Sequence, residues 1–291
     1  MTHDDFGGLQ RDLSGLVDRR RALRWMGGLT LVGLLAACSD GNSTETEGAS
    51  DATTTSAGAT ETDETAESTA DTTADSGDET GVVEASAGDE IPDETAGPYP
   101  ADGSNGPNFL SEEGIIRSDI TTSVGSLSGT AEGVPTSLTL TVVDAATGSP
   151  LPGAAVYLWH CTAGGQYSIY EVTDQDYLRG VQVADEAGRL TFGTVFPGCY
   201  QGRWPHCHFE VYDSVEAASA GSAAIKTSQL ALPQADCEVV YGDGRYGNSL
   251  SNLGLLSLTS DNVFADGWED QLANVSGSID DGYQVSLLVR V

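Results

Sequence analysis

PGCYQGRWPHCHFEVY, residues 197–212, is the stretch that decides the fold of this 291-residue chain. Its two histidines, His206 and His208, are two residues apart at the start of an alternating run. In a β-strand, side chains i and i+2 point to the same face, with roots about 7 Å apart. Both imidazoles are therefore expected to stand side by side on one face of a strand, within reach of one metal ion. Cys207, between them, is expected to point the opposite way.

Other short runs with a period of two recur between residues 96 and 291, at 138–142, 155–159, 190–195 and 284–289. Turn segments rich in Gly, Pro and acidic residues, such as 145–150 and 185–188, separate the runs. Helical periodicity is weak throughout, and its best candidate is 215–224. The pattern predicts a mainly β fold, an antiparallel β-sandwich with its metal site on loops and strand ends, preceded by a disordered acidic tail.

Two tyrosines complete a candidate metal-binding set. Tyr200 lies in the quoted stretch, and Tyr167 lies in the segment GGQYS, residues 164–168. A phenol with an ordinary pKa near 10 ionises on a trivalent cation, because the metal charge stabilises the phenolate. Two phenolates are hard anionic donors that favour ferric over ferrous iron, and two neutral imidazoles complete the set without adding charge. A two-histidine, one-carboxylate set would indicate an Fe(II) oxygenase instead.

These residues resemble the metal signature of the intradiol ring-cleavage dioxygenases, the catechol and protocatechuate 3,4-dioxygenase family. The resemblance runs from TAGPYP (95–100), through VYLWH (156–160) and YLRG (177–180), to Gln229. The family's fold is a β-sandwich, in agreement with the strand pattern. The resemblance implies one Fe(III) per chain, with the metal ligands Tyr167, Tyr200, His206 and His208.

The activity implied by the resemblance is cleavage of a small catechol or hydroxyquinol between its two hydroxyls. O2 is the co-substrate, and the product is a muconate-type dicarboxylic acid. The implied catalytic residues are Arg203, Tyr200 and Gln229. Arg203 is a fixed cation that would stabilise carbanion-like charge on the substrate ring, and Tyr200 would leave the metal and accept a substrate proton. His160 is expected to support the fold around the site rather than to bind the metal.

Two other classes of function stay open. The segment 142–154 resembles the start of transthyretin-like and adhesin β-sandwich modules, which would make the protein a noncatalytic surface module. Such a module would not need two tyrosines and two histidines together. A hydrolase with a different metal would need a carboxylate as general base, and no Asp or Glu stands at a position in the sequence that would identify it as one. Iron content and visible colour of the purified protein separate the first class from the other two.

Residues 1–38 have the pattern of an export signal. A basic segment, 19–24, precedes the apolar run 25–37, which is too short to span a bilayer. The segment LAAC, residues 35–38, resembles a bacterial lipoprotein cleavage box with Cys38 as the lipid-bearing residue. The paired arginines resemble a twin-arginine signal, with a Sec signal as the alternative. We expect an exported lipoprotein, anchored to the membrane at Cys38 on the extracytoplasmic side.

Residues 39–95 consist almost entirely of Ser, Thr, Ala, Gly, Asp and Glu, and contain no Lys or Arg. So few large apolar residues cannot offset the entropy lost on ordering, which predicts a disordered, extended linker. Much of the net charge of −32 lies here and argues against a nucleic-acid partner. The catalytic domain is then expected at 96–291.

Four further cysteines, Cys161, Cys199, Cys207 and Cys237, could oxidise in an exported protein. At most one or two disulfides are expected, and three complete pairings are open. Residues 1–95 take the place of the helical dimerisation segment of the catechol-cleaving family members, so the sequence leaves the oligomeric state undetermined.

Overall fold

A computed structural model describes residues 85–291 of the chain. The predicted signal peptide, the lipid-bearing Cys38 and most of the predicted linker lie outside these residues. Among the described residues, no helix is both long and apolar enough to cross a membrane.

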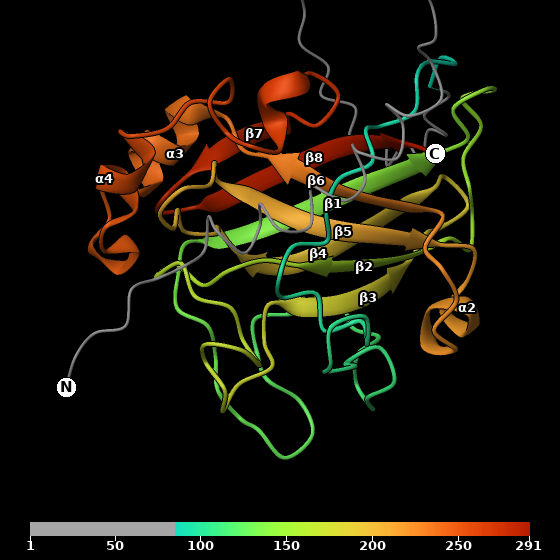
Figure 1. The fold of residues 1–291 in the computed structure, drawn as a ribbon, viewed down its shortest axis with the longest axis horizontal. Helices are drawn as coiled ribbons and strands as arrows, with labels where there is room; N and C mark the ends of the chain where they lie inside the picture. The colour runs from blue at the N-terminus through green and yellow to red at the C-terminus, as the bar shows by residue number, and fades with distance from the viewer. Residues whose placement is uncertain (1–84) are drawn as a thin grey trace, which may run out of the picture. The chain divides into compact units, whose positions relative to one another are not determined.

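The described residues form two four-stranded sheets (Figure 1). The first sheet has the order β4-β1-β8-β7, with β1 Pro135–Val143, β4 Arg189–Val195, β7 Asn274–Ser278 and β8 Gly282–Arg290. The second has the order β3-β2-β5-β6, with β2 Ala155–Trp159, β3 Arg179–Val183, β5 His206–Tyr212 and β6 Lys226–Ala231. The predicted mainly β sandwich is confirmed.

Helices are short and lie at the ends of the sandwich. Figure 1 shows α3 (Gln234–Val240) and α4 (Ser249–Leu253) together at one end and α2 (Val215–Ser219) at the other. Two single 3-10 turns, η1 (Gly244–Tyr246) and η2 (Phe264–Asp266), belong to the long connection between β6 and β7. The predicted helix 215–224 ends early, since Ala220 is its C-cap and Gly221 follows with a φ of +72°.

Alternation in β1 shows how the main core forms. Leu138, Leu140 and Val142 are buried, while the residues between them are partly exposed. Their side chains belong to one apolar cluster with Val156 of β2 and Phe209 of β5. Both sheets therefore bury one face against the other, each large apolar side chain contributing about 1.5–3 kcal/mol.

One strand pair departs from the predicted antiparallel arrangement. β1 and β8 are parallel, with Leu138 beside Val285, whereas the other paired strands of the described residues are antiparallel. Period-two patterning records which face of a strand is buried and carries no information on the direction of its neighbour.

The second sheet is buried on both faces. All five residues of β2 are buried, and the face turned away from the first sheet carries a second apolar cluster. That cluster includes Tyr157 and Trp159 of β2, and also Phe109 and Ile115 from the connection before β1. In the view of Figure 1, loops between residues 100 and 178 gather below β2 and β3. This covered outer face is where the candidate site lies.

Residues 85–95, assigned to the linker from composition, bond to the folded sheets. The N–H of Gly88 donates to the carbonyl of Ala145 at 3.0 Å, and that of Ile91 to Arg290 at 2.9 Å. The N–H of Glu94 donates to Thr227 at 2.8 Å. The predicted boundary at residue 95 thus falls inside a hydrogen-bonded segment, which composition could not reveal because its large apolar content is little more than the buried Ile91.

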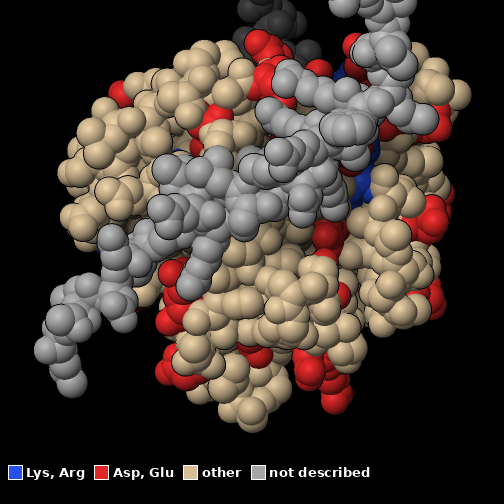
Figure 2. Space-filling model, in the orientation of Figure 1, with Lys and Arg blue, Asp and Glu red and all other residues tan. Residues whose placement is uncertain are grey.

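Acidic groups are spread over the surface of the described residues. Figure 2 shows Asp and Glu scattered between neutral residues, with Lys and Arg confined to the upper right of the visible face. The part of this face that the grey residues leave visible therefore shows no broad basic patch.

Candidate metal centre

A row of four residues crosses the second sheet on its outer face. Strand register places Trp159 of β2 beside His208 of β5, with Arg179 of β3 and Gln229 of β6 at the ends of the row. The rings of Trp159 and His208 are parallel to within 3°, with centroids 5.0 Å apart. Strand pairing therefore fixes the position and the orientation of the His208 imidazole.

The four predicted ligands converge on one point. Nε2 of His206 lies 3.1 Å from Nε2 of His208, 3.3 Å from the Tyr200 hydroxyl and 3.5 Å from the Tyr167 hydroxyl. Tyr167 and both histidines are buried, and Tyr200 is partly exposed. The structure thus brings together residues from a strand and two separate loops.

Both histidines are neutral, and a neutral imidazole can offer a nitrogen lone pair to a metal ion. Nδ1 of His206 lies 2.5 Å from the carbonyl of Trp204. A carbonyl only accepts, so Nδ1 carries the proton and Nε2 of the neutral ring presents its lone pair to the site. Burial lowers the pKa of His206 to about 3, and burial together with the neighbouring His206 lowers the pKa of His208 well below its ordinary value. Two buried neutral rings at this separation need a proton or a cation between them.

The spacing of these donor atoms fits a metal ion. Metal–nitrogen bonds of about 2.0–2.1 Å put two ligand atoms about 3.0 Å apart at 90° and about 3.6 Å apart at 120°. The three distances from His206 Nε2, 3.1, 3.3 and 3.5 Å, fall within this range. The donor set, two phenols and two imidazoles without carboxylate or thiolate, suits a hard trivalent cation such as Fe(III).

The loop that carries Tyr167 is anchored by a buried arginine. The guanidinium of Arg179 donates to the hydroxyl of Ser168 and to its carbonyl, both at 3.0 Å. It also donates to the carbonyl of Tyr99 at 2.7 Å. The carboxylate of Glu171 accepts from the N–H of Tyr167 at 2.9 Å. Arg179 therefore ties this loop, β3 and the segment before residue 101 together beside the site.

The loop that carries Tyr200 is held by α4 and touches the Tyr167 loop. Ser249 Oγ accepts from the N–H of Cys199 at 2.9 Å, and Asn252 donates to the Cys199 carbonyl at 2.8 Å. At Gly165, a β-carbon would lie 3.1 Å from Cβ of Tyr200, and its φ is +81°. Glycine is required here because the two tyrosine loops approach each other so closely.

Arg203 and Gln229, predicted from the family resemblance, meet beside the four predicted metal ligands. The Arg203 guanidinium donates to the side-chain oxygen of Gln229 at 2.7 Å, and the Gln229 amide donates to the Thr95 carbonyl at 2.8 Å. Because Gln229 lies directly across the strands from His208, the longer spacing after the histidines does not remove it from the site.

The sequence analysis missed Asp261. Its carboxylate forms a fully buried ion pair with Arg203, Nε to Oδ2 at 3.0 Å. A buried arginine signals that a carboxylate partner is needed. However, the chain has 44 Asp and Glu residues, and nothing in their spacing distinguishes this one.

His160 and the four cysteines are buried residues that help to build the fold. His160 is buried, with its ring nitrogens 2.8 Å from the Cys161 carbonyl and 2.7 Å from the Thr194 hydroxyl. Burial lowers the pKa of His160 to about 4, so the ring is neutral and engaged by the protein on both sides. The four cysteines of the described residues, Cys161, Cys199, Cys207 and Cys237, are free buried thiols.

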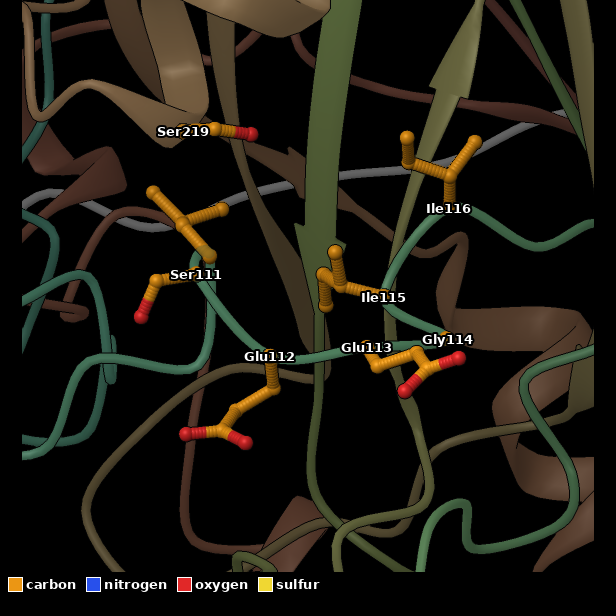
Figure 3. A pocket seen from close by; sticks show the side chains of 8 residues that line it. Ser111, Glu112, Glu113, Gly114, Ile115, Ile116 and Ser219 are labelled. Atoms are coloured by element: carbon orange, nitrogen blue, oxygen red, sulfur yellow. The ribbon is translucent and has the colours of Figure 1, made fainter.

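Two cavities in the described residues lie away from the convergent side chains. One, of about 410 Å³, is lined by residues 110–116 and Ser219 of α2. Figure 3 shows the carboxylates of Glu112 and Glu113 extending away from Ser219. The other, of about 400 Å³, includes Ile169 and Asp176 in its lining. Neither lining contains the tyrosines or histidines of the candidate metal centre.

Comparison with known proteins supports the resemblance to the intradiol ring-cleavage dioxygenases. The profile of a family described as Dioxygenase matches residues 104–226, which include the four convergent side chains and Arg203 but end before Gln229. A catechol 1,2-dioxygenase of Pseudomonas sp. (strain EST1001) is 39% identical over 54 residues, 18% of each chain. A chlorocatechol 1,2-dioxygenase of Pseudomonas sp. (strain P51) is 40% identical over 55 residues, 19% of this chain and 22% of the relative.

These sequence matches span only about a fifth of the length of the curated relatives. A solved structure extends the likeness over the whole sandwich. The intradiol ring-cleavage dioxygenase from Tetranychus urticae is 27% identical, with a TM-score of 0.55, and the match covers 69% of this chain and 94% of that one. Profile, sequence relatives and fold are therefore all similar to the intradiol ring-cleavage dioxygenase family, and the profile match is confined to residues 104–226.

Proposed function

We propose that the protein is a non-haem Fe(III) dioxygenase that cleaves a small catechol or hydroxyquinol between its two hydroxyls. The observation that supports this most directly is that two tyrosine hydroxyls and Nε2 of His208 lie 3.1–3.5 Å from Nε2 of His206. Both atoms of O2 enter the product, a muconate-type dicarboxylic acid, so the reaction needs no external reductant.

Tyr167, Tyr200, His206 and His208 would hold the iron. An Fe(III) ion held by these four residues would supply Lewis-acid activation of the catechol ring toward O2. Both tyrosines lie on loops, and Tyr200 is the more exposed of the two. It is therefore the side chain that yields to substrate and takes a proton from a substrate hydroxyl at its phenolic oxygen.

Arg203 supplies the fixed positive charge of the site. Its guanidinium is buried, and Gln229 and Asp261 hold it on two sides. A buried cation stabilises developing negative charge on a substrate ring far more than a solvated one does. The surrounding aromatic rings, including Tyr99 beside Tyr167 at 5.1 Å between centroids, exclude water from the reacting atoms.

The alternative of a noncatalytic transthyretin-like surface module is not favoured. Such a module would not need the hydroxyls of two tyrosines and Nε2 of His208 gathered within 3.5 Å of Nε2 of His206.

The decisive experiment measures metal and product together. The purified protein should hold about one Fe(III) per chain and absorb visible light through phenolate-to-iron charge transfer. Tyr167→Phe should remove much of that absorption, while Tyr177→Phe should not, because the Tyr177 side chain packs in a separate apolar cluster with Ala131, Leu178 and Val195. Catechol should give a dicarboxylic acid. A colourless protein that takes up no iron, or an aldehyde acid as product, would refute the proposal.

We also propose that residues 1–38 direct export and that Cys38 carries the lipid anchor, with residues 39–84 as the main part of an acidic spacer. A single acyl chain binds membranes only marginally, so stable anchoring needs the several chains of a lipoprotein cysteine. Cys38→Ser should move the protein out of the membrane fraction at unchanged specific activity. Retention of that variant in the membrane fraction would rule out the anchor.

A further inference from the structure

The carboxylate of Asp261 is saturated with hydrogen bonds from the groups around the site. Its Oδ2 accepts from Arg203 Nε at 3.0 Å and from the N–H of Trp204 at 2.7 Å. Its Oδ1 accepts from the N–H groups of Val263 at 2.8 Å and Phe264 at 3.2 Å. Four N–H donors on two oxygens leave the carboxylate a single orientation.

The opposite charges of Asp261 and Arg203 stabilise this set of hydrogen bonds. Burial acts to raise the pKa of Asp261, but the Arg203 guanidinium and the N–H of Trp204 outweigh burial and hold the pKa below its ordinary value. Both side chains of the pair are fully buried. Removal of either partner would leave the other as a buried, uncompensated charge.

The opposite side of the guanidinium is also fixed. A terminal nitrogen of Arg203 donates to Gln229 Oε1 at 2.7 Å, and the guanidinium carbon lies 6.0 Å from the ring centroid of Phe264. That ring in turn packs against His206 at 6.5 Å between centroids. Asp261 thus holds both the arginine and the turn whose phenylalanine lies between the arginine and a metal-binding residue.

We propose that Asp261 is a positioning residue that acts through Arg203, holding the guanidinium where negative charge develops on the bound catechol ring. The inference rests on the proposed function and adds to it a residue that lies outside the matched family profile, which ends at residue 226. A misplacement of about 1 Å in a catalytic group can lower a rate by about 10²-fold. Asp261→Asn, which removes the charge and one of the two acceptor oxygens, is therefore expected to lower kcat by roughly 10- to 100-fold.

The test is a double-mutant cycle of Asp261→Asn and Arg203→Ala in the iron-loaded, full-length protein. If Asp261 acts through Arg203, Asp261→Asn lowers kcat in the wild-type background but changes it less than about 3-fold in the Arg203→Ala background. Iron content and the visible charge-transfer band should stay as in wild type. A crystal structure of Asp261→Asn should show the guanidinium displaced from Gln229.

Asp243 provides a matched control. It caps η1, accepts from Arg245 Nε at 2.8 Å, and lies at the surface. Asp243→Asn therefore repeats the loss of a capping, arginine-paired carboxylate and should leave kcat unchanged. Should Asp261→Asn fail to fold, Asp261→Glu, which keeps the charge on a longer stem, replaces it in the cycle.

Three results would overturn the inference: an unchanged kcat in Asp261→Asn, an equal loss with and without Arg203, or a loss of iron from the variant. The last would place the action of Asp261 on His206 through Trp204 instead. Failure of the proposed function is distinguishable, because the wild-type protein itself would then bind no iron or cleave no catechol.

Discussion

The indole of Trp159 lies parallel to the imidazole of His208, with centroids 5.0 Å apart and an interplanar angle of 3°. Register across β2 and β5 enforces this pairing. Trp159 is fully buried, and its Nε1 has no hydrogen-bond partner among the described residues. The contribution of Trp159 to the site is therefore its flat face, which holds the imidazole in orientation.

Substitution at Trp159 should distinguish the ring face from the N–H group. Trp159→Phe keeps an aromatic face and removes a donor that bonds to nothing, so we expect iron affinity within a few-fold of wild type. Trp159→Leu removes the face and should weaken iron binding by about 10- to 100-fold, as loss of a ligand's supporting partner does. Competition with a chelator measures both. Trp268→Leu, a partly buried tryptophan of the main core, should leave iron affinity unaltered.

Alanine at two consecutive glycines should have opposite outcomes. At Gly165 the φ is +81° and a β-carbon would meet Cβ of Tyr200 at 3.1 Å, whereas at Gly164 the nearest atom is 3.6 Å away. Gly165→Ala should therefore separate the two tyrosine loops and weaken the charge-transfer band, and Gly164→Ala should not. Equal spectra for the two variants would show that the loop contact does not position the tyrosines.

Two truncations should locate the start of the domain. Removal of residues 1–84 keeps the segment that bonds to Ala145, Arg290 and Thr227, but removal of residues 1–95 deletes it. The longer deletion also removes the Thr95 carbonyl that accepts from Gln229. We expect full activity from the shorter truncation, and lower stability with reduced kcat from the longer one, as measured by thermal unfolding and steady-state kinetics. Identical behaviour of the two proteins would place the boundary after residue 95.

Arg179 should be a major determinant of stability despite lacking a carboxylate partner in its hydrogen bonds. Its guanidinium donates to the carbonyls of Tyr99 and Ser168 and to the Ser168 hydroxyl. Arg179→Met removes these three hydrogen bonds, each worth about 0.5–1.5 kcal/mol, and costs more at the buried Ser168 carbonyl. Chemical unfolding should show a loss of several kcal/mol, whereas Arg189→Met, at an exposed position of β4, should change stability by less than about 0.5 kcal/mol. A small loss at Arg179 would contradict its anchoring role.

Stability should also depend on pH through Asp261. Its pKa is lower in the folded protein than its ordinary 3.8, so the unfolded chain binds the proton more readily. The stabilisation from this group is complete above pH 3.8 and is lost as the pH falls through the folded value. The difference in unfolding free energy between wild type and Asp261→Asn should therefore shrink on acidification below about pH 4. A difference that is constant from pH 7 to pH 3 would contradict this assignment.

The sequence supports the fold best where one face of a strand is apolar. The runs 138–142, 155–159, 190–195 and 284–289 all fall within observed strands. β3 and β7 lack that pattern, since β3 carries the buried Arg179 and β7 is the polar segment NVSGS. The direction of β8 beside β1 and the early end of α2 depend on tertiary pairing and on Gly221, which local periodicity does not record.

The candidate site could be predicted as far as its residues occur in a recognisable local order. The histidine pair follows from strand geometry, and both tyrosines belong to segments that resemble a known family. Asp261 had no such signal, and the segment VYLWH that contains Trp159 did not indicate its contact with His208, because both roles depend on which distant partner the fold brings close. Residues 85–95 dock through backbone hydrogen bonds and through ion pairs of Glu90 and Asp93 with the buried Lys226. Composition does not distinguish these two carboxylates from the many other acidic residues of the segment before residue 96.

The parallel pairing of β1 with β8 has a consequence for the order of folding events. The sheet that carries the histidines is built from strands between residues 155 and 231, so its contacts are comparatively local. The opposite sheet stays incomplete until the last strand inserts between β1 and β7. Long-range closure of this kind is entropically slow. The face that carries the candidate metal centre is therefore expected to assemble early, and insertion of β8 is expected to be the rate-limiting step that completes the core.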